Sequence, residues 1–283
     1  MILIADSGST KCDWVLLGKN NKVILKTTTT GINPTLLSPA EIQNILHGSG
    51  DLEKIKENTR KILFYGAGCA GRQSHGRLQK VLSVFFPHAA ITIEEDLTAA
   101  VHGATTLPGV VCILGTGSNC CYYDGKKIHL HHISLGYAVM DECSGNYFGK
   151  QLLKAYFYNH MPSELKIKFE NLFDLSPDSV LKNLYHNENP SAYLAGFARF
   201  LIENRSHTFI KTIIKKGIDS LFETLLKSYS KELKNNPLHF VGSIAWCLQE
   251  EITEQTKHRN YEVKSFVRRP IDNIIANIHN INP

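Results

Sequence analysis

The start of the chain contains the feature that most restricts its fold: two apolar runs of strand length joined by a tight Gly/Ser/Thr turn. The first run begins at Ile2 and ends on the carboxylate of Asp6, and the second continues to Leu17. Gly8 lets backbone approach an anion without interference from a Cβ atom, and the neighbouring hydroxyls add donors. A carboxylate at the strand end can hold a hydrated divalent cation. We therefore expect a phosphate-binding hairpin, with an ordinary polar turn as the alternative.

A second stretch repeats this pattern near the middle of the chain. The apolar run Gly109 to Leu114 leads into a Gly/Thr/Gly/Ser/Asn turn over residues 115–119. Another apolar run ends at Tyr123, and Asp124-Gly125 predicts a turn to a third strand. A nucleotide clamped between two domains needs a phosphate-binding hairpin from each. The repeat therefore favours a duplicated nucleotide-binding architecture over two unrelated hairpins.

The remaining pattern predicts an α/β fold with two domains. A third strand over 22–30 is followed by alternating helices and strands, which is typical of a mixed sheet with helices on its faces. Residues 136–234 are mainly helical, strands follow at 238–241 and 262–267, and a last helix begins at Pro270. We expect a first domain over 1–105, completed by the C-terminal helix 270–283, and a second over 106–269 with a helical insertion. Each domain should contain a mixed five-stranded sheet.

Composition excludes several classes of partner. The net charge of +5 is spread along 283 residues without a basic run interleaved with aromatics, so nucleic acid is not expected. No apolar run reaches membrane-spanning length, and the first strand leaves no room for a signal peptide, so we expect a cytoplasmic protein without a membrane partner. The seven cysteines form no CxxC pair and are expected to be reduced, which argues against zinc or iron-sulfur sites. His131 and His132 should point to opposite faces of a strand and could not share one metal.

Five elements follow one another along the chain in a distinctive order. They are the Asp6 hairpin, an acidic strand end at Asp96, the 115–118 hairpin, the run 141–145 that opens a helix, and the Gly242-Ser243 turn after a late strand. This order resembles the actin, hexokinase and Hsp70 superfamily. Within it, the chain is most similar to the N-acetylglucosamine kinase branch, which is grouped with the BadF/BadG/BcrA/BcrD-type ATPases. The most specific match is the Gly-Thr-Gly-Ser-Asn turn followed by Asp-Glu-x-Ser-Gly.

The resemblance implies a two-domain actin-like ATPase fold of the ribonuclease H-like type and an ATP-dependent kinase acting on a hydroxyl of an amino sugar. N-acetylglucosamine is the expected substrate, with ATP and Mg2+ as cofactors. The implied nucleotide-binding residues are Ser7, Gly8, Ser9, Thr10, Lys11, Gly115, Thr116, Gly117, Gly242 and Ser243. The implied sugar-binding residues are Asn33, Asp96, Ser118, Asn119 and Asp141. Asp6 would lie behind the metal, and Asp96 would be the catalytic base.

Several of these assignments have plainer alternatives. Asp96 and Asp141 could each only cap a helix, Asn33 precedes a proline as in many turns, and Lys11 could be a solvated surface residue.

Two further positions depart from the family pattern. Cys143 stands where the family usually has glycine, which puts the geometry of the sugar loop in question. Asp272-Asn273 follows the last proline where a glycine is usual, which puts the contact of the terminal helix in question.

Two other functions stay open. The first is an ATPase that activates a partner enzyme, as in the activators of acyl-CoA reductases and dehydratases. The second is a regulator that binds a sugar or nucleotide without catalysis. The sequence also leaves open whether the protein forms a homodimer.

Overall fold

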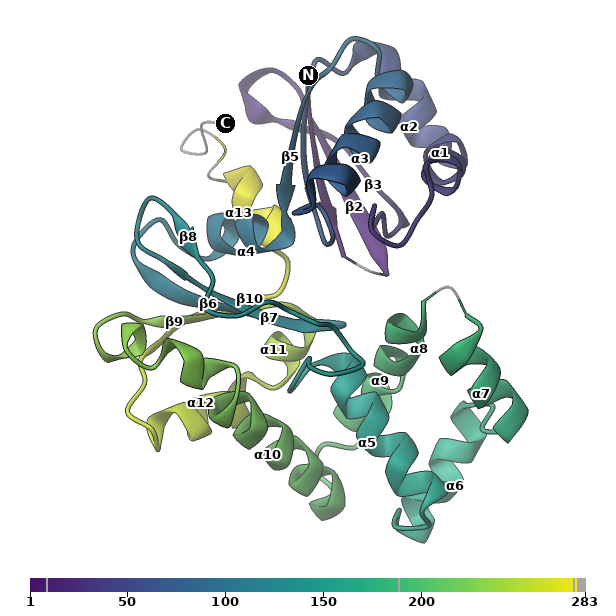
Figure 1. Cartoon of the computed structure of the whole chain (residues 1–283), viewed down its shortest axis with the longest axis vertical. Coiled ribbons are helices and arrows are strands. Elements are labelled where there is room, and N and C mark those ends of the chain that lie inside the picture. The colour runs from purple at the N-terminus through teal and green to yellow at the C-terminus, as the bar shows by residue number, and fades with distance from the viewer. Residues whose placement is uncertain (9, 188, 277, 279–283) are drawn as a thin grey trace. The chain divides into compact units, whose positions relative to one another are not determined.

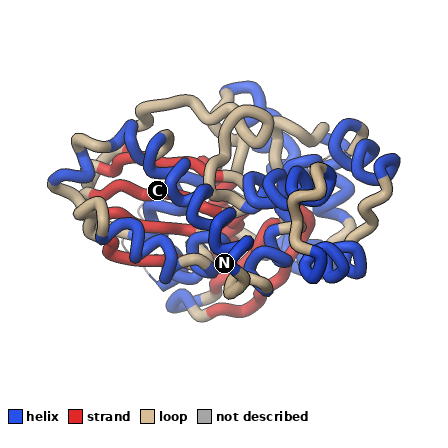
Figure 2. Tube along the Cα trace, turned by 90° about the horizontal axis from the view of Figure 1, so that it is seen from below, coloured by secondary structure: helices blue, strands red, loops and turns tan. Residues whose placement is uncertain are grey.

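The computed structural model describes residues 1–8, 10–187, 189–276 and 278. The chain divides into two compact units, residues 1–103 with 269–283 and residues 104–268 (Figure 1). Each unit contains one five-stranded mixed sheet, which confirms the predicted fold class. Strands and helices are distinguished by colour in Figure 2. Among the described residues, no helix is both long and apolar enough to span a bilayer.

The sheet of unit 1 has the strand order β3-β2-β1-β4-β5. Its strands are β1 (Ile2–Ser7), β2 (Lys11–Leu17), β3 (Val23–Thr30), β4 (Lys61–Gly66) and β5 (Ala90–Glu95). The predicted hairpin forms, with β1 antiparallel to β2 and parallel to β4. In this register Asp6 lies directly opposite Asp13, so the two carboxylates share one face of the sheet.

Helices cover both faces of this sheet (Figure 1). Helices α1 (Pro39–His47), α2 (Gly50–Ile55) and α3 (Arg72–Phe85) pack on the face that carries Leu3 and Trp14. Helices α4 (Asp96–Ala104) and α13 (Pro270–Ala276) pack on the opposite face, against Ile4 and Val15. Alternation along β1 and β2 sends successive side chains to the two cores. Asp6 and Asp13 therefore lie on the α4 and α13 face, beyond its apolar core.

The sheet of unit 2 has the order β10-β9-β6-β7-β8. Its strands are β6 (Gly109–Leu114), β7 (Ser118–Tyr123), β8 (Ile128–His129), β9 (Leu238–Val241) and β10 (Val263–Val267). Its helices are α5 (Gly145–Phe157), α6 (Ser163–Leu172), α7 (Pro177–Tyr185), α8 (Pro190–Gly196), α9 (Ala198–Glu203), α10 (Thr208–Glu223), α11 (Ser243–Cys247) and α12 (Gln249–Lys257). The helices pack on the β6 face that carries Val110, Cys112 and Leu114, and form the largest apolar core.

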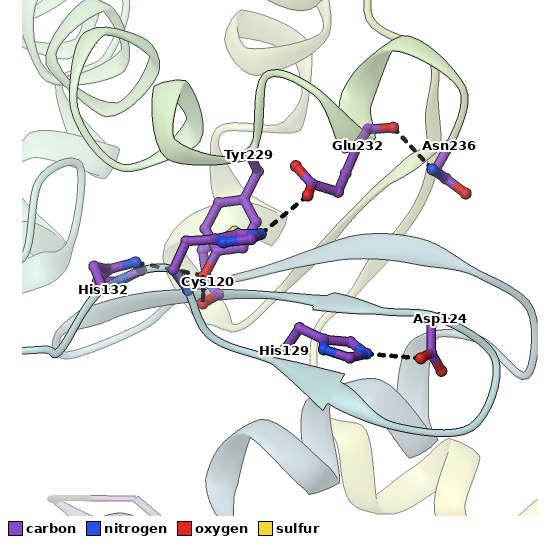
Figure 3. Close-up of polar contacts among 8 residues, drawn as sticks. Cys120, Asp124, His129, His132, Tyr229, Glu232 and Asn236 are labelled. Atoms are coloured by element: carbon purple, nitrogen blue, oxygen red, sulfur yellow. Dashed lines mark hydrogen bonds and ion pairs between the residues drawn. The ribbon is translucent and has the colours of Figure 1, made fainter.

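One local prediction in this unit is wrong. His131 and His132 do not point to opposite faces of a strand, because β8 ends at His129. Both rings instead pack against Tyr229, with centroid distances of 4.7 and 5.9 Å. The Tyr229 hydroxyl donates to the Cys120 carbonyl at 2.6 Å and accepts from the His131 N–H at 3.3 Å (Figure 3). Tyr229 thus anchors the start of the long segment that leads to Asp141.

Candidate functional site

The β1–β2 hairpin gathers carboxylates and cations at one end of its strands. Asp13 is buried, with Oδ2 at 3.0 Å from Lys11 Nζ and Oδ1 at 3.3 Å from Arg269 Nη2. The interpretation of Lys11 as a solvated surface residue is therefore incomplete, because its exposed ammonium group is held by Asp13. Sequence reasoning missed both Asp13 and Arg269. A lone acid inside the apolar strand 12–17 was a usable signal for Asp13, whereas Arg269 is brought in only by the tertiary fold.

Asp6 is electrostatically the least satisfied group of this hairpin. The pKa of Asp6 is raised to about 7, mainly by burial. The carboxylates of Asp13 and Asp96 also raise it, and their effect exceeds the lowering by Arg269 and Lys11. A carboxyl group in this environment gains from a nearby cation. Within the described residues, no three His, Cys, Asp or Glu side chains are grouped so that they could hold a metal by themselves. Mg2+ in proteins is bound through one or two carboxylates, with water and phosphate oxygens completing its shell, and Asp6 is a carboxylate that could serve in this way.

The turn between the two strands is uncrowded beside Gly8. The Gly8 N–H donates to the Lys11 carbonyl at 3.0 Å, and a Cβ atom on Gly8 would meet only that oxygen, at 3.9 Å. The Ser7 hydroxyl is buried and bonded to both the carbonyl and the N–H of Ile32, so it is unavailable to a phosphate. Thr10 is exposed beside the turn, and Ser9 lies outside the described residues.

Ser7 also positions the loop that carries Asn33. The Asn33 Oδ1 atom accepts from the Thr35 N–H at 2.9 Å, so the turn that its sequence suggested does form. The same loop is held by Arg77, which donates to the Pro34 carbonyl at 2.7 Å. The oxygen of Asn33 thus fixes the loop, and its amide nitrogen is the group left to be offered to a ligand.

Asp96 is the first residue of α4, directly after the end of β5. Its Oδ1 atom accepts from the Leu97 N–H at 2.9 Å. The pKa of Asp96 is raised to about 6, mainly by burial. The hydrogen bond from the Leu97 N–H lowers this pKa, and the Glu95 carboxylate raises it. A carboxylate that takes up a proton near neutral pH has the properties of a general base. Glu94, by contrast, is exposed.

In unit 2, Asp141 fixes the β6–β7 turn to the start of α5. Its buried carboxylate accepts from the Ser118 N–H at 3.0 Å and from Asn146 Nδ2 at 2.7 Å. A Cβ atom on Gly117 would lie 2.7 Å from the nearer carboxylate oxygen of Asp141. Glycine is therefore required at 117 by the close approach of Asp141. Asp141 is thus part of the turn's structure as well as a candidate ligand.

The same turn has open space beside Gly115 and a hydroxyl without a partner in the described part of the chain. The Gly145 and Asn146 N–H groups donate to the carbonyls of Gly115 and Thr116, at 2.8 and 2.9 Å, which fixes the turn on α5. A Cβ atom on Gly115 would meet nothing within 4 Å. Ser118 Oγ is buried and has no hydrogen-bond partner in the described part of the chain, as expected of a group that awaits a ligand.

Asn119 lies next to this hydroxyl but is used locally. Its Oδ1 atom accepts from the Cys120 N–H at 2.9 Å. The Gly242 turn also lies against the hairpin: Gly242 has φ of +113°, and a Cβ atom there would be 2.5 Å from the Leu114 carbonyl oxygen. Glycine is thus needed for this approach, and Ser243, which starts α11, is exposed.

Both departures from the family pattern are accommodated by the fold. Cys143 has φ of +59°, in the left-handed region that glycine adopts without strain, and its side chain is buried in the core of unit 2. The backbone there keeps a conformation suited to glycine. Asn273 donates from Nδ2 to the Gly103 carbonyl at 2.7 Å, and Asp272 faces Arg269 at 3.8 Å. Asn273 thus attaches the terminal helix to α4, and Asp272 also lies 3.7 Å from Lys26 Nζ of β3.

Comparison with known proteins identifies the family. No family model matches the chain, and no curated protein matches its sequence. The crystal structure of a candidate N-acetylglucosamine kinase from Porphyromonas gingivalis is 30% identical in sequence, with a TM-score of 0.91 over 99% of both chains. The chain belongs to the N-acetylglucosamine kinase-like family. The family resemblance expected from the sequence motifs is confirmed.

More distant structures share the fold of this N-acetylglucosamine kinase-like chain. A candidate N-acetylglucosamine kinase from Chromobacterium violaceum is 15% identical, with a TM-score of 0.70 over 97% of both chains. A ROK family glucokinase from Streptomyces griseus, solved with glucose and AMPPNP, is 10% identical, with a TM-score of 0.58 over 96% of both chains. At these identities the likeness concerns the fold alone, and it confirms the actin-like ATPase architecture.

Proposed function

We propose that this N-acetylglucosamine kinase-like protein transfers the terminal phosphoryl group of ATP to a hydroxyl of an amino sugar, with N-acetylglucosamine as the substrate. The observation that carries the proposal is Asp96, a carboxylate at a strand end whose pKa is raised to about 6 by burial. Phosphoryl transfer needs a carboxylate that accepts the proton of the attacking hydroxyl. The 30% identical Porphyromonas gingivalis protein, described as a candidate kinase for this sugar, supports the choice of substrate.

The chain's own residues then divide into three roles. The uncrowded turns at Gly8 and Gly115, with Thr10, Lys11 and Thr116, bind phosphates, and the Gly242-Ser243 turn lies under the adenosine. When bound, Mg2+ neutralises charge on the phosphates, and Asp6 is the residue that holds it. Asn33, Ser118, Asn119 and Asp141 recognise the sugar hydroxyls, and Asp96 accepts the proton. An ATP analogue bound to the Streptomyces griseus glucokinase supports ATP as the donor.

A coupled assay for ADP release tests this proposal. The protein is incubated with Mg2+, ATP and, separately, N-acetylglucosamine, N-acetylmannosamine, glucosamine and glucose. We expect ADP release that depends on the sugar and has its highest kcat/KM for N-acetylglucosamine. ATP hydrolysis that is independent of every sugar would instead favour an ATPase that activates a partner enzyme. Nucleotide binding with no turnover would favour a regulator.

Replacing Gly117 by valine should weaken binding of both substrates. Its Cβ atom would displace the Asp141 carboxylate, which lies 2.7 Å from that position, and its branched side chain would narrow the approach to the turn. We expect at least a tenfold loss of affinity for Mg-ATP by calorimetry, together with a higher KM for the sugar. Gly76→Val is a control for the effect of valine, because a Cβ atom at Gly76 meets nothing within 4 Å. Parental affinity in Gly117→Val would exclude this turn from the nucleotide site.

A further inference from the structure

Asn146 forms a polar bridge in the interior of unit 2. Its Nδ2 atom donates to Asp141 Oδ2 at 2.7 Å and to Ser191 Oγ at 3.2 Å. Its Oδ1 atom lies 3.2 Å from Ser144 Oγ, whose hydroxyl lies closer to the Asp141 carbonyl oxygen, at 2.7 Å. The Asn146 side chain is completely buried. A buried amide group that donates to two partners orients both of them, because rotation of the amide would leave a buried partner unsatisfied.

Ser191 comes from the helical insertion and reaches this bridge because α8 lies directly on α5. A Cβ atom on Gly149 would be 1.9 Å from the Leu194 carbonyl oxygen, and one on Gly145 would be 3.0 Å from the Ala195 Cβ atom. The two glycines on one face of α5 thus allow backbone contact between the helices. This contact leaves little freedom in the position of the Ser191 hydroxyl.

The bridge acts on a carboxylate held in an unusual backbone conformation. Asp141 has φ of +76°, which a non-glycine residue keeps only when its surroundings impose it. Each of its carboxylate oxygens accepts one protein hydrogen bond, from Ser118 and from Asn146. Each oxygen keeps acceptor capacity for a ligand hydroxyl, in a direction that those two bonds set.

We propose that Asn146 and Ser191 are positioning residues through which the helical insertion orients Asp141 and so determines which sugar hydroxyls are accepted. This inference rests on the proposed function, in which Asp141 binds the sugar. It gives α8 a part in substrate selection, although α8 belongs to neither of the two phosphate-binding hairpins. Variation of residue 191 would then change sugar preference more than ATP binding.

Steady-state kinetics of two variants test the inference. In Asn146→Ala, we expect the KM for N-acetylglucosamine to rise about tenfold, the scale for losing one hydrogen bond to a charged group, with the KM for ATP within twofold of the parent. Ser191→Ala removes only the outer partner, so it should fold normally and raise the sugar KM about two- to fivefold. In both variants the ratio of kcat/KM between N-acetylglucosamine and N-acetylmannosamine should approach one, because the Asp141 carboxylate would no longer accept sugar hydroxyls in one fixed direction.

Asn204→Ala is a matched control, since it removes a partly buried amide that donates to the Phe200 carbonyl in the same unit. It should lower the melting temperature without changing either KM. Parental sugar KM and selectivity in both test variants would overturn the inference while the proposed function stands. A parent enzyme without sugar-dependent ADP release would overturn both. Equal rises in the KM for sugar and for ATP would also overturn it, because they would indicate general damage to unit 2.

Discussion

Asp96→Asn should lower kcat by roughly 100-fold or more, the usual scale for loss of a general base. Asparagine can keep the bond that Asp96 Oδ1 accepts from the Leu97 N–H at 2.9 Å, and it caps helices about as well as aspartate. It cannot accept the proton of an attacking hydroxyl. We therefore expect the melting temperature and the affinity for Mg-ATP to stay near those of the parent, while turnover measured by ADP release is lost.

Glu95→Gln is the matched control, because it removes a neighbouring carboxylate at the end of β5. It should leave kcat within a few-fold of the parent. Turnover in Asp96→Asn that is also within a few-fold would show that the base lies elsewhere, and Asp141 would be tested next. In the parent enzyme, the raised pKa of Asp96 adds an independent check. A base with a pKa of about 6 is protonated below that pH, so kcat should fall as the pH decreases through 6 and be flat above 7.

Asp6→Asn should have opposite effects on stability and on ligand binding. Without ligand, it should raise the melting temperature by several degrees at pH 8, because it removes a buried charge that two other carboxylates disfavour. It should also weaken binding of Mg-ATP by at least tenfold, because the carboxylate that would hold the metal is lost. Thermal unfolding with and without Mg-ATP measures both effects on one sample.

The stability gained by Asp6→Asn depends on pH because the pKa of Asp6 is raised in the folded protein. A carboxyl group whose pKa is raised from 3.8 to about 7 costs folding free energy when ionised. The gain in Asp6→Asn should therefore grow from pH 4 to pH 7 and stay constant above. Asp13→Asn is the contrasting control: it leaves Lys11 and Arg269 without their buried partner, so it should destabilise the protein. A destabilised Asp6→Asn at pH 8, or one with parental Mg-ATP affinity, would contradict this account.

The sequence predicted the elements whose causes are local. The hairpin at Asp6 formed as expected. The sequence Ser38-Pro39-Ala40-Glu41 is likewise typical of a helix start, and it forms a capping box at the start of α1. Alternating polarity and capping act over a few residues, so a single sequence contains the information. Apolar residues recur at helical spacing over 209–229, but α10 ends at Glu223. The helical segment that starts at Ser243 is interrupted at Leu248. Helix ends depend on packing as well as on periodicity.

The parts of the candidate site that the sequence did not reveal depend on distant contacts. Arg269 reaches Asp13 across most of the chain, and Ser191 reaches Asn146 only because α8 packs on α5. Neither pairing leaves a periodic signal. Ser7 matched the expected motif, but its hydroxyl was already committed to Ile32. A motif indicates which residue types are present, whereas burial and partners decide which of their atoms a ligand can reach.

The terminal helix has a consequence for the order in which the newly made chain can fold. Ile271 and Ile274 of α13 complete the apolar core behind Ile4, and Arg269 pairs with Asp13. Residues 104–268 are continuous and can fold as soon as they leave the ribosome. The amino-terminal unit, although synthesised earlier, lacks the part of this core that α13 supplies until α13 has been made. The complete core of unit 1 therefore forms only after residues 104–268 have been synthesised.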